Sequence, residues 1–349
     1  MYSSLVKRLH DSHPGTFFLN PQDPEGLERF LHKTSRLSPG EHITNMEKPG
    51  EGNMNCVVRV ITNIQSFIIK QARPWVEKYP QVAAPIERIL VEGVYLQQMQ
   101  SSAVTSQMTP SVLWEDASHY MMALEDLGHC RDLINLYARE QKIDPSKIRE
   151  LTSYLRDLHR MTAPDGFPAN LSMKKLNHEH IFRFPFDPQN GLALDEIQPG
   201  LSSLAEPIQH NAPLKQLISS LGLVYLSDGF TLLHGDFYPG SWLDSTHGLR
   251  VIDPEFAFLG TPEFDLGIMM AHMFLSSQNA GIVPVIWQSY GRPNEIDVIL
   301  MSGFAGVEIL RRLIGIAQLP LPMSIDEKRD LIQMAQAFVE EGALAQQFN

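Results

Sequence analysis

Two acidic motifs in the second half of the chain carry residue types that could do chemistry. Asp236 closes an HGD motif directly after an apolar run, so its carboxylate is expected on a loop, facing a substrate hydroxyl. Its main role would be to orient that hydroxyl, and it would accept the hydroxyl proton late in the reaction. Asp253 and Glu255 flank Pro254 after the next apolar run, and two carboxylates held by a stiff proline suit Mg²⁺. Ser241 could add a further oxygen ligand to this metal.

A glycine-rich segment, GEGNMN at 50–55, separates two candidate strands in the first half of the chain. Gly50 and Gly52 let backbone N–H groups come close to phosphate oxygens, and the side chain of Asn53 could add a donor. A glycine turn is also an ordinary way to close a hairpin. The segment is not a Walker A loop, because no GK[ST] follows it.

A lysine near the end of an apolar strand is the second candidate for binding phosphates. Lys70 ends the run FIIK, and a cation there needs a carboxylate to orient it. Glu92, on a predicted helix, is the expected partner, and Glu87 on the same helix is the alternative. Each of these charges, taken alone, is also compatible with a solvated surface. The ordered set of glycine turn, lysine, glutamate, HGD and DPE is far more specific, and it predicts a phosphoryl-transfer site.

The surrounding elements predict a strand-rich first half and a helix-rich second half. Strands are expected at 55–62, 65–71, 111–114 and 120–124, with helices from 23 and at 85–98. In the second half, helices are expected from 144 and at 213–221, 302–318 and 325–341, around a strand-turn-strand element at 231–236 and 249–253. We therefore predict an α+β fold with two lobes, 1–127 and 128–349, and a cleft between them.

Composition narrows the class of partner. The chain has 349 residues, 43% of them hydrophobic and 19% charged, which excludes disorder. A net charge of −12 argues against nucleic acid or an anionic membrane as partner. The N-terminal segment lacks the apolar core of a signal peptide, no apolar stretch is long enough to span a membrane, and the two cysteines form no CxxC motif. We expect a cytoplasmic protein with a small-molecule substrate.

The chain resembles the protein-kinase-like small-molecule kinases of the aminoglycoside and choline phosphotransferase group, and it is most similar there to the 5-methylthioribose kinases. An adjacent arginine pair, Arg311 and Arg312, within a GxEIxRRxIGxA pattern is typical of the methylthioribose kinases. The matching segments are GEGNMN (50–55), FIIKQARP (67–74), ILVEGVYL (89–96), ALEDL (123–127), LHGD with GS (233–241), VIDPEFAF (251–258), FDLG (264–267) and GVEILRRLIGIA (306–317).

The resemblance implies a two-lobed protein-kinase-like fold, with a small antiparallel-sheet N-terminal lobe and a larger, mainly helical C-terminal lobe. It implies an ATP- and Mg²⁺-dependent kinase of methionine salvage, with Asp236 as catalytic base, and it suggests a homodimer. Arg311 and Arg312 would face the sugar, and Asp253, Glu255 and Ser241 would hold the metal. The implied ATP-binding residues are Gly50, Gly52, Asn53, Lys70, Glu92, Glu125, Asp126, Leu127, Asp253, Pro254 and Glu255, of which Glu125, Asp126 and Leu127 form the hinge.

The acceptor stays open between several alternatives. The family pattern HGDLHTGS is replaced here by HGDFYPGS, with Tyr238 and Pro239 beside the base. The 1-hydroxyl of 5-methylthioribose is the leading acceptor, and a related 5-substituted pentose or a polyol is the next. A choline- or aminoglycoside-type acceptor would suit the net charge, although the arginine pair would repel a cation. The remaining alternative is a catalytically silent nucleotide-binding pseudokinase, which would usually lack Lys70, Asp236 or Asp253.

Overall fold

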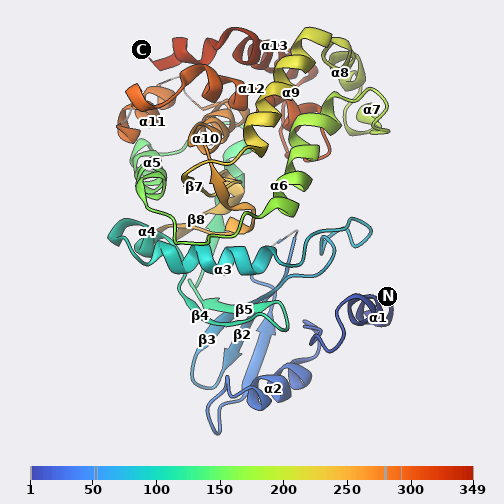
Figure 1. Ribbon diagram of the computed structural model, residues 1–349, viewed down its shortest axis with the longest axis vertical. Coiled ribbons are helices and arrows are strands. Elements are labelled where there is room, and N and C mark those ends of the chain that lie inside the picture. The colour runs from blue at the N-terminus through green and yellow to red at the C-terminus, as the bar shows by residue number, and fades with distance from the viewer. Residues whose placement is uncertain (1, 51, 53, 279–280, 292, 349) are drawn as a thin grey trace. The chain divides into compact units, whose positions relative to one another are not determined.

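The computed structural model describes every residue of the chain except 1, 51, 53, 279–280, 292 and 349 (Figure 1). The chain divides into two compact units. Unit 1 comprises residues 1–101 and 109–129, and unit 2 comprises 102–108 and 130–349. The short helix α4 (Ala103–Met108) thus groups with unit 2 although the chain on both sides of it belongs to unit 1.

Unit 1 is built on one antiparallel sheet of five strands in the order β1-β2-β3-β5-β4. Its strands are β1 (Ile43–Glu47), β2 (Cys56–Thr62), β3 (Ser66–Gln71), β4 (Val112–Asp116) and β5 (Met121–Glu125). Every second residue of β2 is buried, as expected of a strand with one face on a core. The register sets Lys70 of β3 between Val57 of β2 and Met122 of β5.

Helices flank this sheet. They are α1 (Tyr2–Ser12), α2 (Pro24–Lys33) and α3 (Arg88–Met99). Asp23 caps α2, because its side chain accepts a hydrogen bond from the N–H of Gly26. Leu27 and Leu31 of α2 join β2 and β3 in the core of this unit. Helix α3 contacts β4 and β5, and it starts three residues later than predicted (Figure 1). The sequence prediction missed α1 and β1.

Helices dominate unit 2. Besides α4, they are α5 (Pro145–Arg160), α6 (Leu171–His178), α7 (Leu194–Ile197), α8 (Leu201–His210), α9 (Ala212–Leu226), α10 (Glu263–Leu275), α11 (Ile282–Tyr290), α12 (Val298–Ile314) and α13 (Ile325–Glu341). Short turns of 3-10 or π helix, labelled η, are η1 (Leu133–Tyr137), η2 (Glu179–Arg183), η3 (Phe184–Phe186), η4 (Pro239–Ser241), η5 (Pro254–Phe256), η6 (Pro293–Glu295) and η7 (Ala343–Phe348).

Helix α12 is the centre of unit 2 and packs against α10 and α13 (Figure 1). All its residues from Met301 to Ile314 are buried. Glycines allow the close approach, because a side chain at Gly306 would collide with the carbonyl of Ala335 on α13, and one at Gly267 of α10 would crowd Met301. Such tight packing on both sides fixes the position of any side chain at the end of α12.

Two small antiparallel sheets complete unit 2. Strand β7 (Thr231–Leu233) pairs with β10 (Phe258–Gly260), and β8 (Trp242–Ser245) pairs with both β6 (Cys130–Asp132) and β9 (Gly248–Val251). The prediction of one strand-turn-strand element was therefore wrong, since its two strands belong to different sheets. Strand β10, short and followed directly by α10, carried no alternating pattern that could reveal this pairing.

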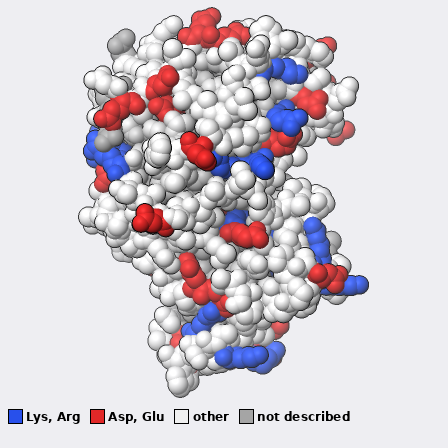
Figure 2. Space-filling model, viewed as in Figure 1, with Lys and Arg blue, Asp and Glu red and all other residues white. Residues whose placement is uncertain are grey.

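The predicted fold class is confirmed. The protein is α+β, with an antiparallel sheet in unit 1 and a mainly helical unit 2, as in proteins with the protein-kinase-like fold. None of the described helices is long and apolar enough to cross a membrane. On the face shown in Figure 2, described basic and acidic side chains are interspersed.

Candidate active site

The loop that carries Asp236 is shaped by a glycine and a buried carboxylate. Gly235 has φ of 82°, and a side chain there would collide with the carbonyl of Phe256. The carboxylate of Asp265, on α10, accepts hydrogen bonds from the backbone N–H groups of His234 at 2.7 Å and of Gly235 at 3.0 Å. Asp265 is fully buried, so its charge is satisfied by this loop and by His159, whose Nε2 lies 3.3 Å away.

Side chains on both sides of Asp236 tie the same loop to its neighbours. The Nε2 of His234 lies 3.1 Å from the carbonyl oxygen of Ile252, and its Nδ1 accepts from the N–H of Asp236. The Oγ of Ser241 donates to the carbonyl oxygen of Asp236 at 3.0 Å. Ser241 therefore stabilises the loop through the hydrogen bond that it donates. Its oxygen lone pairs could still bind the predicted metal.

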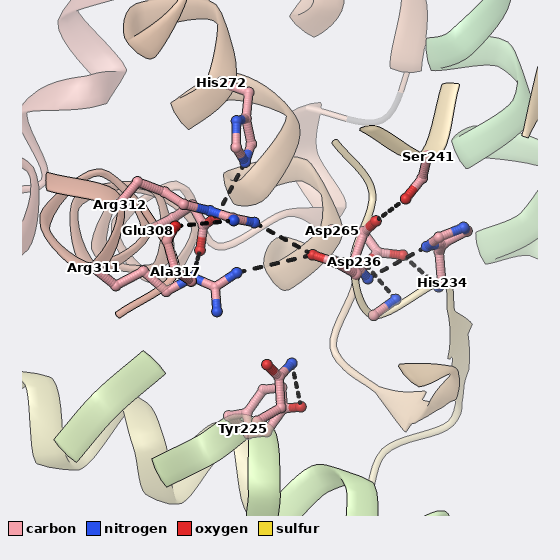
Figure 3. A network of polar contacts seen from close by, with 12 residues as sticks. Tyr225, His234, Asp236, Ser241, Asp265, His272, Glu308, Arg311, Arg312 and Ala317 are labelled. Atoms are coloured by element: carbon pink, nitrogen blue, oxygen red, sulfur yellow. Dashed lines mark hydrogen bonds and ion pairs between the residues drawn. The ribbon is translucent and has the colours of Figure 1, made fainter. Parts of the chain in front are cut away.

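The arginine pair at the end of α12 faces Asp236 (Figure 3). Nη2 of Arg312 lies 3.6 Å and Nη2 of Arg311 lies 3.9 Å from Oδ1 of Asp236. Both guanidinium groups are held from behind by Glu308, whose carboxylate oxygens lie 2.5 Å from Nε of Arg311 and 2.7 Å from Nε of Arg312. Both arginines are buried, so this end of α12 is not an exposed charged face.

The two carboxylates in contact with these arginines have opposite pKa shifts. Burial raises the pKa of Asp236 to about 6, although Arg312 and Arg311 oppose the rise. A quarter (25%) of the Asp236 side chain is exposed, so solvent limits this rise. Burial also acts to raise the pKa of Glu308, but Arg311 and Arg312 overcome it and hold that pKa well below its ordinary value. Glu308 is thus a permanent anion, and Asp236 can exchange a proton.

Asp253 and Glu255 lie beyond the end of β9, at the start of the turn η5. Asp253 adopts a left-handed backbone, with φ of 62°, which is uncommon outside glycine and occurs at functional sites. The side chain of Asn170 donates to the carbonyls of Glu255 and Ala257 and fixes this turn. Repulsion from the Glu255 charge also contributes to the raised pKa of Asp236. A bound cation would therefore reduce the repulsion between these carboxylates.

This donor set fits magnesium bound together with phosphates. No group of three or more His, Cys, Asp or Glu side chains that could hold a metal ion occurs among the described residues. Mg²⁺ in phosphoryl-transfer proteins is commonly held by one or two carboxylates and completed by phosphate oxygens and water. Asp253 and Glu255 match that requirement.

In unit 1, Lys70 and Glu92 form a buried ion pair. Nζ of Lys70 lies 2.8 Å from Oε1 of Glu92, and the two residues are 3% and 1% exposed. Glu92, and not Glu87, is therefore the carboxylate that contacts Lys70. The alternative of solvated surface charges does not apply to either residue.

The other predicted ATP-binding residues of unit 1 lie in the loop between β1 and β2 and at the end of β5. Gly50 and Gly52 are exposed in the loop between β1 and β2, and Asn53 lies outside the described residues. Glu125 ends β5, and its carboxylate accepts from the N–H of Ser111. The carboxylate of Asp126 is bound by Arg59 at 3.0 Å. Both side chains are thus engaged within unit 1.

The structure brings Asp236 and the arginine pair together in unit 2, and Lys70 and Glu92 together in unit 1. The sequence analysis assigned no role to Asp265, which holds the loop of Asp236, although it lies in the matched FDLG segment. It also assigned no role in the site to Glu308, or to His272, which contacts Glu308.

A carboxylate on a fixed loop, opposite two buried guanidinium groups, is an arrangement suited to small-molecule phosphoryl transfer. A family model described as the phosphotransferase enzyme family matches residues 46–299. The chain belongs to that family, which confirms the prediction of an enzyme of the phosphotransferase class.

Relatives of similar length support the predicted resemblance. A methylthioribose kinase of Exiguobacterium sibiricum is 26% identical over 84% of this chain and 84% of its own length. A methylthioribose kinase of Bacillus pumilus is 24% identical over 87% of this chain and 89% of its own. The fold is shared with a spectinomycin phosphotransferase solved in complex with ADP and spectinomycin, with a TM-score of 0.55 and 13% identity over 93% of this chain and 100% of that one.

Proposed function

We propose that this enzyme is an ATP- and Mg²⁺-dependent kinase that phosphorylates the 1-hydroxyl of 5-methylthioribose or of a related 5-substituted pentose. The observation that carries the proposal is the placement of Arg311 and Arg312, buried and anchored by Glu308, within 4 Å of the partly exposed carboxylate of Asp236. The names of the curated relatives support the choice of a thioribose acceptor.

In the proposed reaction, Asp236 orients the acceptor hydroxyl and receives its proton. The acceptor oxygen forms a bond to the γ-phosphorus of ATP, and the bond from that phosphorus to the bridging oxygen of ADP breaks. ADP leaves with the electron pair, and the proton passes from Asp236 to solvent. Arg311 and Arg312 neutralise charge on the transferring phosphoryl oxygens, so positioning and electrostatics supply most of the rate enhancement.

The remaining residues are proposed to hold ATP and the metal. Lys70, oriented by Glu92, would bind phosphate oxygens, and the loop with Gly50, Gly52 and Asn53 would offer backbone and side-chain donors. The backbone at 125–127 would bind the adenine. Asp253 and Glu255, with Ser241 near them in the chain, would hold Mg²⁺, which supplies charge neutralisation on the phosphates when bound.

A cationic acceptor is the second candidate. The net charge of −12 would attract choline or an aminoglycoside. The local charge argues against it, because a cation beside Asp236 would also lie beside two guanidinium groups. We therefore favour an acceptor without positive charge.

An acceptor panel tests the proposal. Purified enzyme with MgATP is incubated with 5-methylthioribose, 5-deoxyribose, ribose, choline and an aminoglycoside, and ADP formation is followed together with ³¹P NMR of the products. We expect sugar 1-phosphate from the 5-substituted pentoses and no product from the two cations. Preferred turnover of choline or the aminoglycoside would contradict the proposed acceptor, and ATP binding without transfer to any compound would favour a silent nucleotide-binding protein.

The variant Asp236→Asn tests the role of the base. It keeps the size and polarity of the side chain but cannot accept the proton, so turnover should fall by at least about 100-fold. Its affinity for ATP should stay nearly unchanged, since Asp236 is assigned to the acceptor. Unchanged turnover in this variant would refute the assignment.

A further inference from the structure

We infer that His272 is a positioning residue of this site. The catalytic consequence of this inference rests on the proposed function. The ring, with its proton on Nε2 and with Nδ1 bound by Tyr137, holds Glu308 and thereby holds both arginines opposite Asp236.

The geometry assigns the proton on the ring. His272 lies in the last turn of α10 and is fully buried. Its Nε2 lies 3.1 Å from Oε1 of Glu308, and its Nδ1 lies 2.6 Å from the hydroxyl oxygen of Tyr137. An ionised carboxylate can only accept, so Nε2 must carry the proton. Nδ1 of the uncharged ring is then an acceptor, and the Tyr137 hydroxyl donates to it.

The Glu308 carboxylate receives three donors and has its orientation set by them. Oε1 accepts from His272 and from Nε of Arg312, and Oε2 accepts from Nε of Arg311. The residue is fully buried, so no water-exposed rotamer competes with this arrangement. Without the His272 donor, Oε1 would be bound on one side only. The carboxylate could then rotate, and Arg312, which shares that oxygen, would move with it.

Electrostatics support an uncharged ring at this position. Burial, reinforced by the charges of Arg312 and Arg311, lowers the pKa of His272 to about 4, although Glu308 opposes the shift. A protonated ring would add a third cation beside two guanidinium groups. Neutral imidazole supplies a donor to Glu308 without cancelling the negative charge that the arginines need.

The ring of Tyr238 packs against both His272 and Arg312. Its ring centroid lies 5.2 Å from that of His272, and the guanidinium carbon of Arg312 lies 4.8 Å from the Tyr238 ring. Gly240 makes room for the ring, because a side chain there would collide with it. Tyr238 is one of the positions that depart from the family pattern, so this departure acts on the support of the arginine pair.

The test uses the full-length enzyme and the variants His272→Met and His272→Gln. Methionine fills the space without a donor, whereas glutamine can place an amide N–H near the position of Nε2. With the best acceptor of the panel and MgATP, His272→Met should lower kcat per folded molecule by about 10-fold or more, with KM for ATP within twofold of wild type. His272→Gln should recover most of kcat. His178→Met, which removes a half-buried histidine packed against Phe182, is the matched control and should keep wild-type kcat.

A spectroscopic measurement makes the inference independent of turnover. In ¹⁵N NMR, the His272 ring should show a protonated Nε2 and an unprotonated Nδ1, and the Nε–H signal of Arg312 should shift in His272→Met. A proton on Nδ1, or a kcat of His272→Met within twofold of wild type, would overturn the inference. If wild type transfers phosphate to no acceptor, the proposed function fails, and the NMR result alone decides whether His272 positions Glu308 and Arg312.

Discussion

Each unit buries an ion-paired cluster of basic and acidic side chains, but the two clusters are constructed differently. In unit 1, Lys70 on β3 meets Glu92 on α3, so the contact depends on packing of a helix against a sheet. In unit 2, Glu308, Arg311 and Arg312 lie on the single helix α12 at i, i+3 and i+4. The second cluster is thus local in sequence and is buried only because α12 is surrounded by other helices.

The charge count of the two clusters also differs. Lys70 and Glu92 carry one charge each, whereas Glu308 compensates only one of the two guanidinium charges it holds. The excess positive charge of that cluster is directed at Asp236, where a phosphoryl group is proposed to be transferred. A buried pair that balances its charges serves to orient a side chain, while an unbalanced cluster attracts an anion.

Removal of Glu308 should have the largest effect. Glu308→Ala leaves two buried guanidinium groups without their anchor, and we expect the free energy of unfolding to fall by about 5 kcal/mol. Urea denaturation followed by circular dichroism measures this. Glu308→Gln, which keeps an acceptor oxygen, should lose less, and adding Arg312→Met to Glu308→Ala should recover only part, because Arg311 remains. A loss below about 1 kcal/mol in Glu308→Ala would contradict the central role given to Glu308.

Breaking the ion pair in unit 1 should lower the free energy of unfolding by less, and a second substitution should restore more of it. Glu92→Leu removes the counter-charge of Lys70 and should lower the free energy of unfolding by about 3 kcal/mol. The double variant Lys70→Met with Glu92→Leu should return to within about 1 kcal/mol of wild type, because an apolar pair can replace a buried ion pair. The same denaturation experiment measures both. A double variant no more stable than Glu92→Leu would show that the two clusters respond alike.

The acid dependence of stability should reveal the burial of the His272 ring. The pKa of His272 falls from 6.5 to about 4 on folding, so the unfolded chain binds the proton first as the pH drops. Between those values the unfolded state holds more protons, and this contribution to stability decreases as the pH falls. Burial is the main cause of the lowered pKa; the charges of Arg312 and Arg311 add to it, and Glu308 opposes it. Tyr137 and Tyr238 also face the ring.

Denaturation of wild type and His272→Gln at several pH values measures this contribution. The difference in unfolding free energy between them should change by up to about 1.4 kcal/mol per pH unit within this window, in favour of the variant toward acid. Curves that stay parallel from pH 6.5 to 4 would show that the buried ring takes up its proton as readily as an exposed one.

Local patterns allowed much of the fold to be predicted. The stripe of Ile148, Leu151 and Leu155 predicted α5, and Asp144 caps that helix as its position before Pro145 indicates. Helix α13 has the predicted bounds, Ile325–Glu341. These elements succeed because cap, period and composition agree within one segment. Strand β1 was missed because its residues are only partly buried or exposed, which leaves no apolar alternation.

The support of the site could not be predicted, because it depends on contacts between distant segments. Tyr137 and His272 are brought together by packing of η1 near α10, and neither residue belongs to a motif that spacing reveals. Glu308 was visible beside the arginines, yet sequence alone could not decide whether α12 is buried. On an exposed helix, Glu308 and Arg312 would form an ordinary i, i+4 surface pair. Because α12 is buried, Glu308 instead holds the arginines in place.

The smallest effect is expected from Tyr137→Phe, which removes one hydroxyl and leaves the ring in place. Nδ1 of His272 then loses its donor while Nε2 still contacts Glu308, so the free energy of unfolding should fall by about 1 kcal/mol. In a cycle with His272→Gln, the second substitution should cost less when the first is present, because the two residues share one hydrogen bond. Thermal and urea denaturation of the four proteins measure this coupling. Strictly additive losses would show that Tyr137 and His272 stabilise the protein separately. Tyr137 would then have no part in the contacts by which His272 and Glu308 hold the arginine pair.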